Sequence, residues 1–187
     1  MRVIGGKYRG RKLETLPGLD VRPTSDRLRE TLFNILSPMI SGARFLDLCA
    51  GSGAVGVEAA SRGVGGVTFV EQSRTACAAI QKNLERLGIA EGALVLNQDA
   101  GSALKALDQQ RDSFDVIYID PPYAAGLYDE VMGLISRSEL LAQDGVVIVE
   151  HRSKEPPESS YDRLVEYRQV KQGQSQLAFY KRQKPEE

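Results

Sequence analysis

DLCAGSGAVG, residues 47–56, is the stretch that decides the fold. The run Arg44–Ala50, which overlaps its beginning, is rich in apolar residues and predicts a buried strand, and Ala54–Arg62 predicts a helix. Between them, three glycines have the GxGxxG spacing with which a strand turns sharply into a helix: Gly51, Gly53 and Gly56. We therefore expect a nucleotide-type cofactor at this turn. The alternative is a glycine turn needed only for close packing of strand and helix.

Outward from this turn, strand-like and helix-like segments alternate. The further strands are expected at Gly66–Glu71, Ala93–Gln98, Phe114–Asp120 and Val146–Glu150, and the further helices at Ser73–Leu87, Gly101–Leu107 and Leu127–Ser136. This rhythm predicts an α/β fold with a parallel sheet covered on both faces. The segments Leu164–Val170 and Gln176–Lys181, separated by Gly173, predict a C-terminal antiparallel hairpin. We expect a Rossmann-like, mostly parallel seven-stranded sheet.

The beginning of the chain departs from that rhythm. Arg2–Tyr8 and Lys12–Thr15 flank a turn at Gly10 and predict a small β-hairpin. An amphipathic helix is expected at Asp26–Leu36, capped by Thr24 or Ser25, with one apolar face made of Leu28, Leu32, Ile35 and Leu36. These features predict an N-terminal extension, residues 1–40, followed by a catalytic domain, residues 41–183.

Positive charge is concentrated at the N-terminus. The net charge is −1, yet the first twelve residues contain five cations and no acid: Arg2, Lys7, Arg9, Arg11 and Lys12. One interpretation is a polyanionic partner that engages this segment. The other is a solvated hairpin whose charges serve solubility.

Several classes of protein fit the composition poorly. The longest apolar runs are too short for a membrane span, and no apolar signal core follows Arg2, so we expect a cytoplasmic protein. Cys49 and Cys77 form no CxxC pair and are expected to be reduced thiols. His151, the only histidine, belongs to no cluster with metal-ligand spacing, so we expect no metal. A structural role for His151 is favoured over that of a catalytic base.

The charge of Asp47 indicates which cofactor the turn holds. This carboxylate precedes the glycines, where it would repel the pyrophosphate of a dinucleotide but attract the cationic amino acid and sulfonium of S-adenosylmethionine. Glu71 falls twenty residues after Gly51, where an acid binds ribose hydroxyls. Asp99 is expected either to accept from the adenine amino group or to cap the next helix. Ala50 and Ala100 are included among the expected cofactor contacts.

The tetrapeptide Asp120-Pro121-Pro122-Tyr123 predicts the chemistry. An exocyclic amine is a poor nucleophile because its lone pair is delocalised into the base. Two acceptors, the Asp120 side chain and the Pro121 carbonyl, can bind its two hydrogens and free that lone pair. The two prolines stiffen the turn, and the ring of Tyr123 can stack on a flipped-out base. The alternative is a Pro-Pro turn that merely ends a strand.

Together, DLCAGSG and DPPY resemble the class I methyltransferases that modify amino groups. RVIGGKYRGRKL at residues 2–13 and VRPTSDRLRETLFN at residues 21–34 are further similar to the RsmD family, whose members methylate N2 of one guanine in 16S rRNA of the bacterial small ribosomal subunit. The similarity covers nearly the whole chain. Cys49 stands where relatives often have an aromatic residue, and Ile35 where tryptophan is common.

The resemblance implies roles for individual residues and a partner. It implies S-adenosylmethionine contacts from Asp47, Gly51, Gly53, Glu71 and Asp99, and target-base contacts from residues 120–123. It also implies that the basic segment engages RNA, through Lys7, Arg9, Arg11, Lys12 and Arg22. We expect a monomer that acts on 16S rRNA within a small subunit or an assembly intermediate.

Two other functions stay open. Another amino-methyltransferase, acting on DNA adenine N6 or on a protein glutamine amide, would use the same loop chemistry. A DNA enzyme, however, usually carries an added recognition domain. A non-catalytic RNA-binding assembly factor is the second alternative, and the intact loop at residues 120–123 argues against it.

Overall fold

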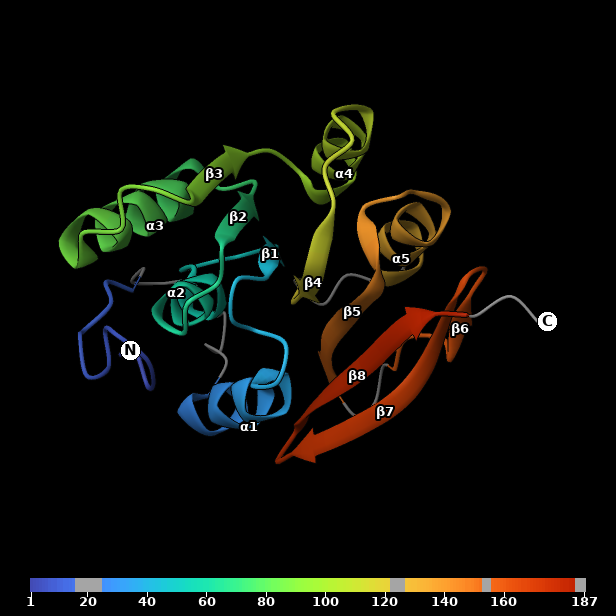
Figure 1. The fold of residues 1–187 in the computed structure, drawn as a ribbon, viewed down its shortest axis with the longest axis horizontal. Coiled ribbons are helices and arrows are strands. Elements are labelled where there is room, and N and C mark those ends of the chain that lie inside the picture. The colour runs from blue at the N-terminus through green and yellow to red at the C-terminus, as the bar shows by residue number, and fades with distance from the viewer. Residues whose placement is uncertain (16–24, 122–126, 153–155, 184–187) are drawn as a thin grey trace.

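An eight-stranded sheet forms the centre of the protein in a computed structural model of the 187-residue chain, which describes residues 1–15, 25–121, 127–152 and 156–183 (Figure 1). The strands are β1 (Arg44–Leu48), β2 (Gly66–Glu71), β3 (Ala93–Asn97), β4 (Phe114–Ile119), β5 (Leu141–Arg152), β6 (Ser160–Tyr161), β7 (Leu164–Gln172) and β8 (Ser175–Arg182). The helices are α1 (Asp26–Leu36), α2 (Ala54–Ser61), α3 (Arg74–Leu87), α4 (Ala100–Gln109) and α5 (Leu127–Arg137).

The strand order across the sheet is β3-β2-β1-β4-β5-β8-β7-β6. Strands β1 to β5 are parallel, and β8, β7 and β6 follow in antiparallel pairs, which confirms the expected C-terminal hairpin. The two-residue β6 raises the count from the expected seven strands to eight. Because the order reverses between β1 and β4, a crevice is expected outside the carboxyl ends of these two strands.

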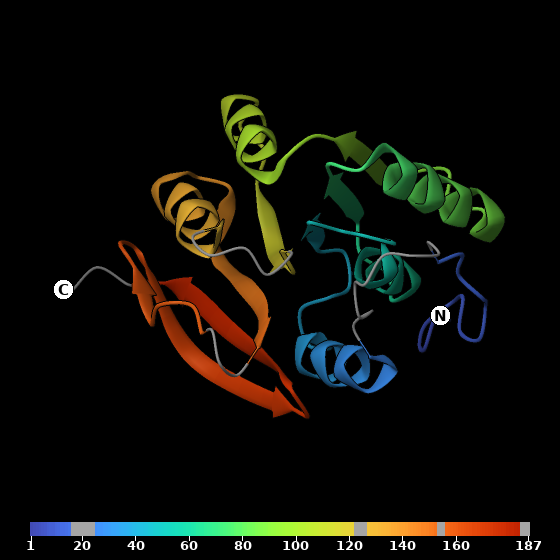
Figure 2. The same cartoon turned by 180° about the vertical axis from the view of Figure 1, so that it is seen from behind.

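Helices cover both faces of the sheet, as Figures 1 and 2 show. Apolar side chains of α1, α2 and α3 pack with one face in a core that includes Phe45 and Phe69. Side chains of α4 and α5 pack with the other face in a second core that includes Ile117 and Val147. The central strands are buried on both faces, which explains why their sequences are almost continuously apolar. No helix within the described ranges is long and apolar enough to cross a membrane.

Helix α1 has the bounds that the amphipathic pattern predicted. The Ser25 hydroxyl accepts a hydrogen bond from the Leu28 N–H at 3.1 Å and caps the helix. The buried face differs from the prediction in its composition. Ile35 is only partly buried, whereas Phe33 packs on Phe45 with ring centroids 6.2 Å apart. Arg29 is also completely buried on this helix.

The expected N-terminal hairpin is present only as one antiparallel bridge between Arg2 and Lys12. Around this bridge, the N–H groups of Val3 and Leu13 donate across the hairpin to the carbonyls of Arg11 and Met1, both at 3.0 Å. Glu58, fully buried on α2, accepts hydrogen bonds from the N–H groups of Ile4 at 2.8 Å and Gly5 at 2.7 Å. Because Glu58 takes these two donors, the cross-hairpin hydrogen bonds stop short of Ile4 and the short hairpin is fixed to α2.

The same core contains residues from both sides of the predicted boundary at residue 40. Val3 and Leu13 are buried there with side chains of α1 and α2. The amide of Asn83 on α3 also exchanges hydrogen bonds with the backbone of Glu14, at 2.7 and 3.1 Å. The division into an extension and a catalytic domain therefore stays a prediction about sequence organisation.

Candidate functional site

The candidate site lies where β1 and β4 end side by side. Leu48, the last residue of β1, is paired with Val70 of β2 on one side and with Ile119 of β4 on the other. The glycine turn follows Leu48, and Asp120 follows Ile119. Because carboxyl ends of parallel strands meet at one edge, the predicted cofactor turn and the predicted catalytic loop are neighbours.

Asp47 and Gly56 fix the shape of the glycine turn. The Asp47 carboxylate is only 2% exposed, and its Oδ2 accepts a hydrogen bond from the Gly56 N–H at 2.7 Å. A Cβ on Gly56 would lie 2.3 Å from Cε1 of Phe69 and 2.9 Å from Asp47 Oδ2, so only glycine fits. By contrast, a Cβ on Gly51 would meet nothing within 4 Å, and its φ of 55° is the reason for glycine there. Gly51 thus borders open space suited to a ligand.

Glu71 ties this turn to the end of β2. One carboxylate oxygen accepts from the Gly51 N–H, and the other accepts from the Ser73 N–H, both at 2.8 Å. The spacing of twenty residues therefore corresponds to direct contact between the acid and the glycine turn. Each carboxylate oxygen has a second lone pair, so Glu71 can still accept from a hydroxyl-bearing ligand.

Three acidic side chains of the site act on the Cys49 thiol. Burial raises the pKa of its thiol to about 12, and the carboxylates of Glu71, Asp120 and Asp47 contribute in that order. The thiol is therefore neutral at physiological pH and no nucleophile. Its φ of 64° is a left-handed conformation, which costs a non-glycine residue about 1–2 kcal/mol. The turn is thus held in a strained shape.

Burial, followed by the nearby Glu71 carboxylate, raises the pKa of Asp47 to about 7, although the Gly56 hydrogen bond opposes that shift. In the free protein near neutral pH, Asp47 is accordingly divided between its acid and its anion. A ligand that brings positive charge to this position favours the anion.

Asp120 stands in a different environment. It is partly exposed, and its backbone N–H donates to the Leu48 carbonyl at 3.3 Å. Burial, then the Glu150 carboxylate and then Asp47, raise the pKa of Asp120 well above its usual value. Within the described part of the chain, no group donates a hydrogen bond to the Asp120 carboxylate. Pro121 is buried beside it, whereas Pro122 and Tyr123 lie outside the described residues.

Glu150 is a candidate site residue that the sequence reasoning did not single out. It is 5% exposed, near the end of β5, and accepts a hydrogen bond from the Tyr118 hydroxyl. The Tyr128 hydroxyl donates to its backbone carbonyl at 3.3 Å. A charged residue that continues the apolar run VVIVE was the available signal.

Asp99 caps α4, which was one of the two roles expected for it. It is exposed, and its Oδ1 accepts from the Ser102 N–H at 2.9 Å, a bond that lowers the pKa of this carboxyl. Its second oxygen is available to a ligand, so the adenine contact stays a prediction. Ala100 is buried at the first position of α4, and the Ala50 carbonyl accepts from the Gly53 N–H at 2.8 Å.

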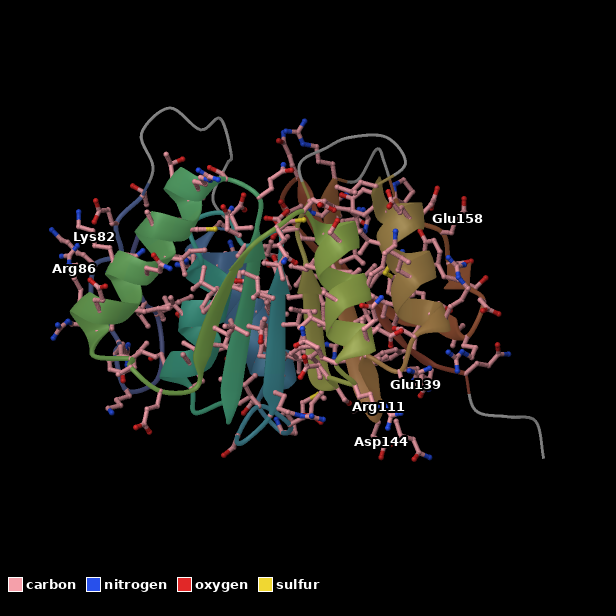
Figure 3. The ribbon with its side chains drawn as sticks, turned by 90° about the horizontal axis from the view of Figure 1, so that it is seen from above. Lys82, Arg86, Arg111, Glu139, Asp144 and Glu158 are labelled. Carbon is pink, nitrogen blue, oxygen red and sulfur yellow. The ribbon has the colours of Figure 1, made fainter. Side chains whose placement is uncertain are left out.

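The predicted RNA-binding cations Lys7, Arg9, Arg11 and Lys12 are all exposed, and Arg22 lies outside the described residues. Arg11 donates to the Arg86 carbonyl at 3.2 Å, which joins the segment to α3. Figure 3 shows Lys82 and Arg86 on the outer side of α3, at the opposite end of the molecule from Glu139 and Glu158. The exposed basic surface thus extends from the N-terminal segment onto α3.

His151 takes no place in this site. It is buried next to Glu150 in β5, and neighbouring strand residues face opposite sides of a sheet. Its Nδ1 lies 2.9 Å from the Arg152 carbonyl, and burial lowers its pKa. Among the residues that the structure describes, no group of three His, Cys, Asp or Glu side chains could hold a metal ion.

Comparison with known proteins shows the family to which the chain belongs. The family model described as conserved hypothetical protein 95 matches residues 1–181. "Ribosomal RNA small subunit methyltransferase D" of Escherichia coli (strain K12) is 42% identical over 150 residues, which cover 80% of this chain and 74% of that protein. Among solved structures, E. coli yhhF has a TM-score of 0.86 at 35% identity and covers 98% of both chains.

A more distant structure shares the fold alone. SMU.776, solved in complex with SAH, has a TM-score of 0.67 at 16% identity and covers 83% of this chain and 48% of its own. The strand order, the glycine turn and these similarities agree on a Rossmann-like class I methyltransferase fold. The match over residues 1–181 shows that the chain belongs to the conserved hypothetical protein 95 family, which is the RsmD family.

Proposed function

We propose that this protein transfers a methyl group from S-adenosylmethionine to the exocyclic N2 of a guanine in 16S rRNA of the small ribosomal subunit. The observation that carries the chemistry is the Asp120 carboxylate, an acceptor with no described donor, next to the glycine turn. Family membership and the rRNA methyltransferase of E. coli support the RNA substrate. Such a substrate places the reaction in the cytoplasm.

Residues of the glycine turn fit S-adenosylmethionine. Asp47 offers an oxygen that does not bind Gly56. A cationic group beside this carboxylate would lower its raised pKa and favour the anion. The open side of Gly51 and the second lone pairs of Glu71 suit a ribose. The remaining proposed contacts are Ala50, Gly53, Asp99 and Ala100. The bound cofactor supplies an electrophilic methyl group; SAH in the SMU.776 complex supports this choice.

Asp120 and Pro121 bind and activate the amine. The Asp120 carboxylate accepts one N2–H and the Pro121 carbonyl accepts the other, so that the nitrogen lone pair is released from the base. Held in line about 3–3.5 Å from the methyl group, the amine would take that group while the sulfur keeps the electron pair of the broken S–C bond, and the methylated nitrogen would pass its extra proton to the Asp120 carboxylate. Ionised Asp120 is needed, because a protonated carboxyl donates where this step requires an acceptor. Pro122 and Tyr123 complete the proposed loop and lie outside the described residues.

The basic surface binds the RNA backbone. Lys7, Arg9, Arg11 and Lys12, with Arg22 from the sequence prediction, would neutralise phosphates, and Lys82 and Arg86 extend the same surface. These contacts position the RNA without reading its sequence. We propose a monomer that acts on the small subunit or on an assembly intermediate.

Methylation of isolated subunits tests the function. Small subunits from a strain that lacks the endogenous enzyme are incubated with the protein and tritium-labelled S-adenosylmethionine, and the rRNA nucleosides are then analysed. We expect label in N2-methylguanosine of 16S rRNA, and none when large subunits or DNA replace the small subunits. Label in DNA or in ribosomal protein without label in 16S rRNA would contradict the proposal, as would label in N6-methyladenosine.

A further inference from the structure

A buried polar cluster lies beside Asp120 and has no part in the chemistry proposed above. It consists of Arg29 on α1, Tyr118 on β4 and Glu150 on β5, with exposed fractions of 0%, 1% and 5%. Charged side chains are seldom buried unless they are paired or perform a function. The position of this cluster next to the acceptor loop favours a function.

Strand register places Glu150 next to Asp120. Tyr118 pairs with Ile148, and Ile119 pairs with Val149, so that Asp120 and Glu150 come next at the same edge. Side chains alternate along a strand, so Tyr118, Asp120 and Glu150 project from the same face. The hydrogen bond from the Tyr118 hydroxyl to Glu150 supports this arrangement, and the charge of Glu150 acts on Asp120. The acceptor loop therefore has two neighbouring carboxylates.

Arg29 approaches the same face from α1. Its Nη2 donates to the Arg2 carbonyl at 2.9 Å and to Asp26 at 2.7 Å. Its Nε and Nη1 are buried and have no hydrogen-bond partner among the described residues. Unpaired buried donors of a charged group carry a desolvation penalty, which a ligand acceptor would relieve. Tyr118 packs in the same core as the apolar side chains of α1 and is one of the groups that act on Arg29, so the guanidinium lies on the side of α1 that faces Tyr118.

The cluster complements one nucleobase edge. Along its Watson–Crick edge, guanine presents two donors, N2–H and N1–H, followed by the acceptor O6. Adenine and cytosine do not present this series. On one face of the sheet, the Asp120 and Glu150 carboxylates and the Arg29 guanidinium, which has unpaired N–H groups, provide the matching series of acceptor, acceptor and donor.

We propose that Glu150 and Arg29 select guanine: Glu150 accepts from N1–H and Arg29 donates to O6 while Asp120 holds the N2 amine. This inference rests on the proposed function and names how its acceptor base is recognised. Tyr118 acts as a positioning residue, because its hydroxyl holds Glu150 toward the base.

The test uses small subunits reconstituted with 16S rRNA that carries guanine, 2-aminopurine or 1-methylguanine at the target position. All three keep the N2 amine, but 2-aminopurine lacks N1–H and O6, and 1-methylguanine lacks N1–H. We expect the wild-type kcat/KM to fall at least about 100-fold for both analogues, because the carboxylate loses its donor. Equal rates on guanine and either analogue would overturn the proposal without any variant.

The second part of the test measures the same three substrates with the Glu150→Gln and Arg29→Met variants. A glutamine amide can donate to the unprotonated N1 of 2-aminopurine, so we expect the preference for guanine over 2-aminopurine to shrink at least about tenfold. Arg29→Met should lower the rate on guanine about tenfold or more and leave 2-aminopurine unchanged, since that base has no O6. Unchanged preferences in variants that still bind cofactor would refute the roles of Glu150 and Arg29.

The same experiment distinguishes a failure of the proposed function from a failure of the proposed base selection. If the wild-type protein leaves guanine-containing subunits unmethylated, the substrate itself is wrong. If it methylates them and the analogues equally, only the base-reading role is wrong. Melting temperature and cofactor affinity of each variant show whether a loss of activity comes from unfolding.

Discussion

The carboxylates on the two sides of the site are held in opposite ways. On the cofactor side, backbone N–H groups bind them: Gly56 donates to Asp47 at 2.7 Å, and two N–H groups at 2.8 Å hold Glu71. On the acceptor side, Asp120 and Glu150 are neighbours whose charges oppose each other, and the Tyr118 hydroxyl donates to Glu150. The cofactor side is thus shaped by backbone donors of the fold itself, whereas no described group donates to the Asp120 carboxylate on the acceptor side.

This difference indicates where substrate binding acts. A ligand on the cofactor side adds contacts to carboxylates that are already oriented. On the acceptor side, the two donors of a guanine would relieve a repulsion that the free protein tolerates. Strained or mutually repelling groups of this kind persist where function needs them. The comparison predicts that mutations on the two sides separate catalysis from cofactor binding.

The largest effect is expected at Asp120. Asp120→Ala removes an acceptor for the reacting amine and should lower kcat by at least about 100- to 1,000-fold, the usual range for losing one group that stabilises a transition state. Cofactor affinity should stay within a few-fold of the wild type. Methyl transfer and equilibrium dialysis with S-adenosylmethionine measure the two quantities.

Stability provides a control for the same position. The folded-state pKa of Asp120 is raised, so its ionisation destabilises the folded protein as pH rises above the unfolded value. Asp120→Asn should therefore unfold at a higher temperature than the wild type at pH 8, and the difference should shrink toward pH 5. A variant that is inactive and also less stable at pH 8 would contradict the view of Asp120 as a destabilised acceptor.

The two sides also differ in how well the sequence predicted them. Glycine spacing and the twenty-residue interval to Glu71 are local signals of contacts within one β-α-β unit, and the structure has those contacts. Glu150 joins Asp120 only through the pairing of β5 with β4, and sequence patterns contain no register between strands. From the sequence, Arg29 resembled a solvent-exposed charged residue on an amphipathic helix. The missed residues are those whose role depends on tertiary contacts.

The N-terminal segment shows the same limit. Its alternation around Gly10 predicted a hairpin, which the structure has over a short stretch, but the buried carboxylate of Glu58 on α2 takes the N–H groups of Ile4 and Gly5 that would extend it. A glutamate within an apolar helix gave no indication of its partner. The helix α1, in contrast, depends on its cap and its own periodicity, and its bounds were predicted correctly.

The next effect concerns the shape of the cofactor side. Gly56→Ala places a Cβ 2.3 Å from Phe69, and such overpacking typically costs about 1–3 kcal/mol. We expect a lower free energy of unfolding and weaker cofactor binding together. Gly51→Ala is the matched control, because its Cβ meets no atom within 4 Å.

At Gly51 the φ of 55° alone strains alanine, by about 1–2 kcal/mol. Its loss of stability should therefore be the smaller of the two, while cofactor binding falls because the Cβ enters the open side of the turn. Chemical denaturation and equilibrium dialysis measure both variants. A Gly56→Ala protein as stable as the wild type would show that Phe69 moves aside freely.

Cofactor affinity should also depend on pH through Asp47. Its pKa of about 7 in the free protein means that protonation removes the attraction for a cation as pH falls from 8 to 6. One such group weakens binding about tenfold over this window. The rise in melting temperature that S-adenosylmethionine produces should accordingly be larger at pH 8 than at pH 6, and Asp47→Asn should abolish the difference. A wild-type affinity that is constant from pH 6 to 8 would show that Asp47 does not face the cationic end of the cofactor.

The smallest effect concerns the basic surface, which is fixed to α2 and α3 and which we propose binds the RNA. Reversing Arg9 and Lys12 to glutamate should weaken RNA binding and reduce the slope of log affinity against log salt by about 1.4–1.8, as expected for two lost phosphate contacts. Cofactor affinity, and kcat with saturating RNA, should not change. Reversing Lys105 and Arg111 alters the net charge equally on a distant part of the surface, where Figure 3 places Arg111 near Asp144. If both pairs change the salt slope alike, net charge alone explains RNA binding, whereas a change confined to Arg9 and Lys12 identifies the N-terminal segment as the RNA contact.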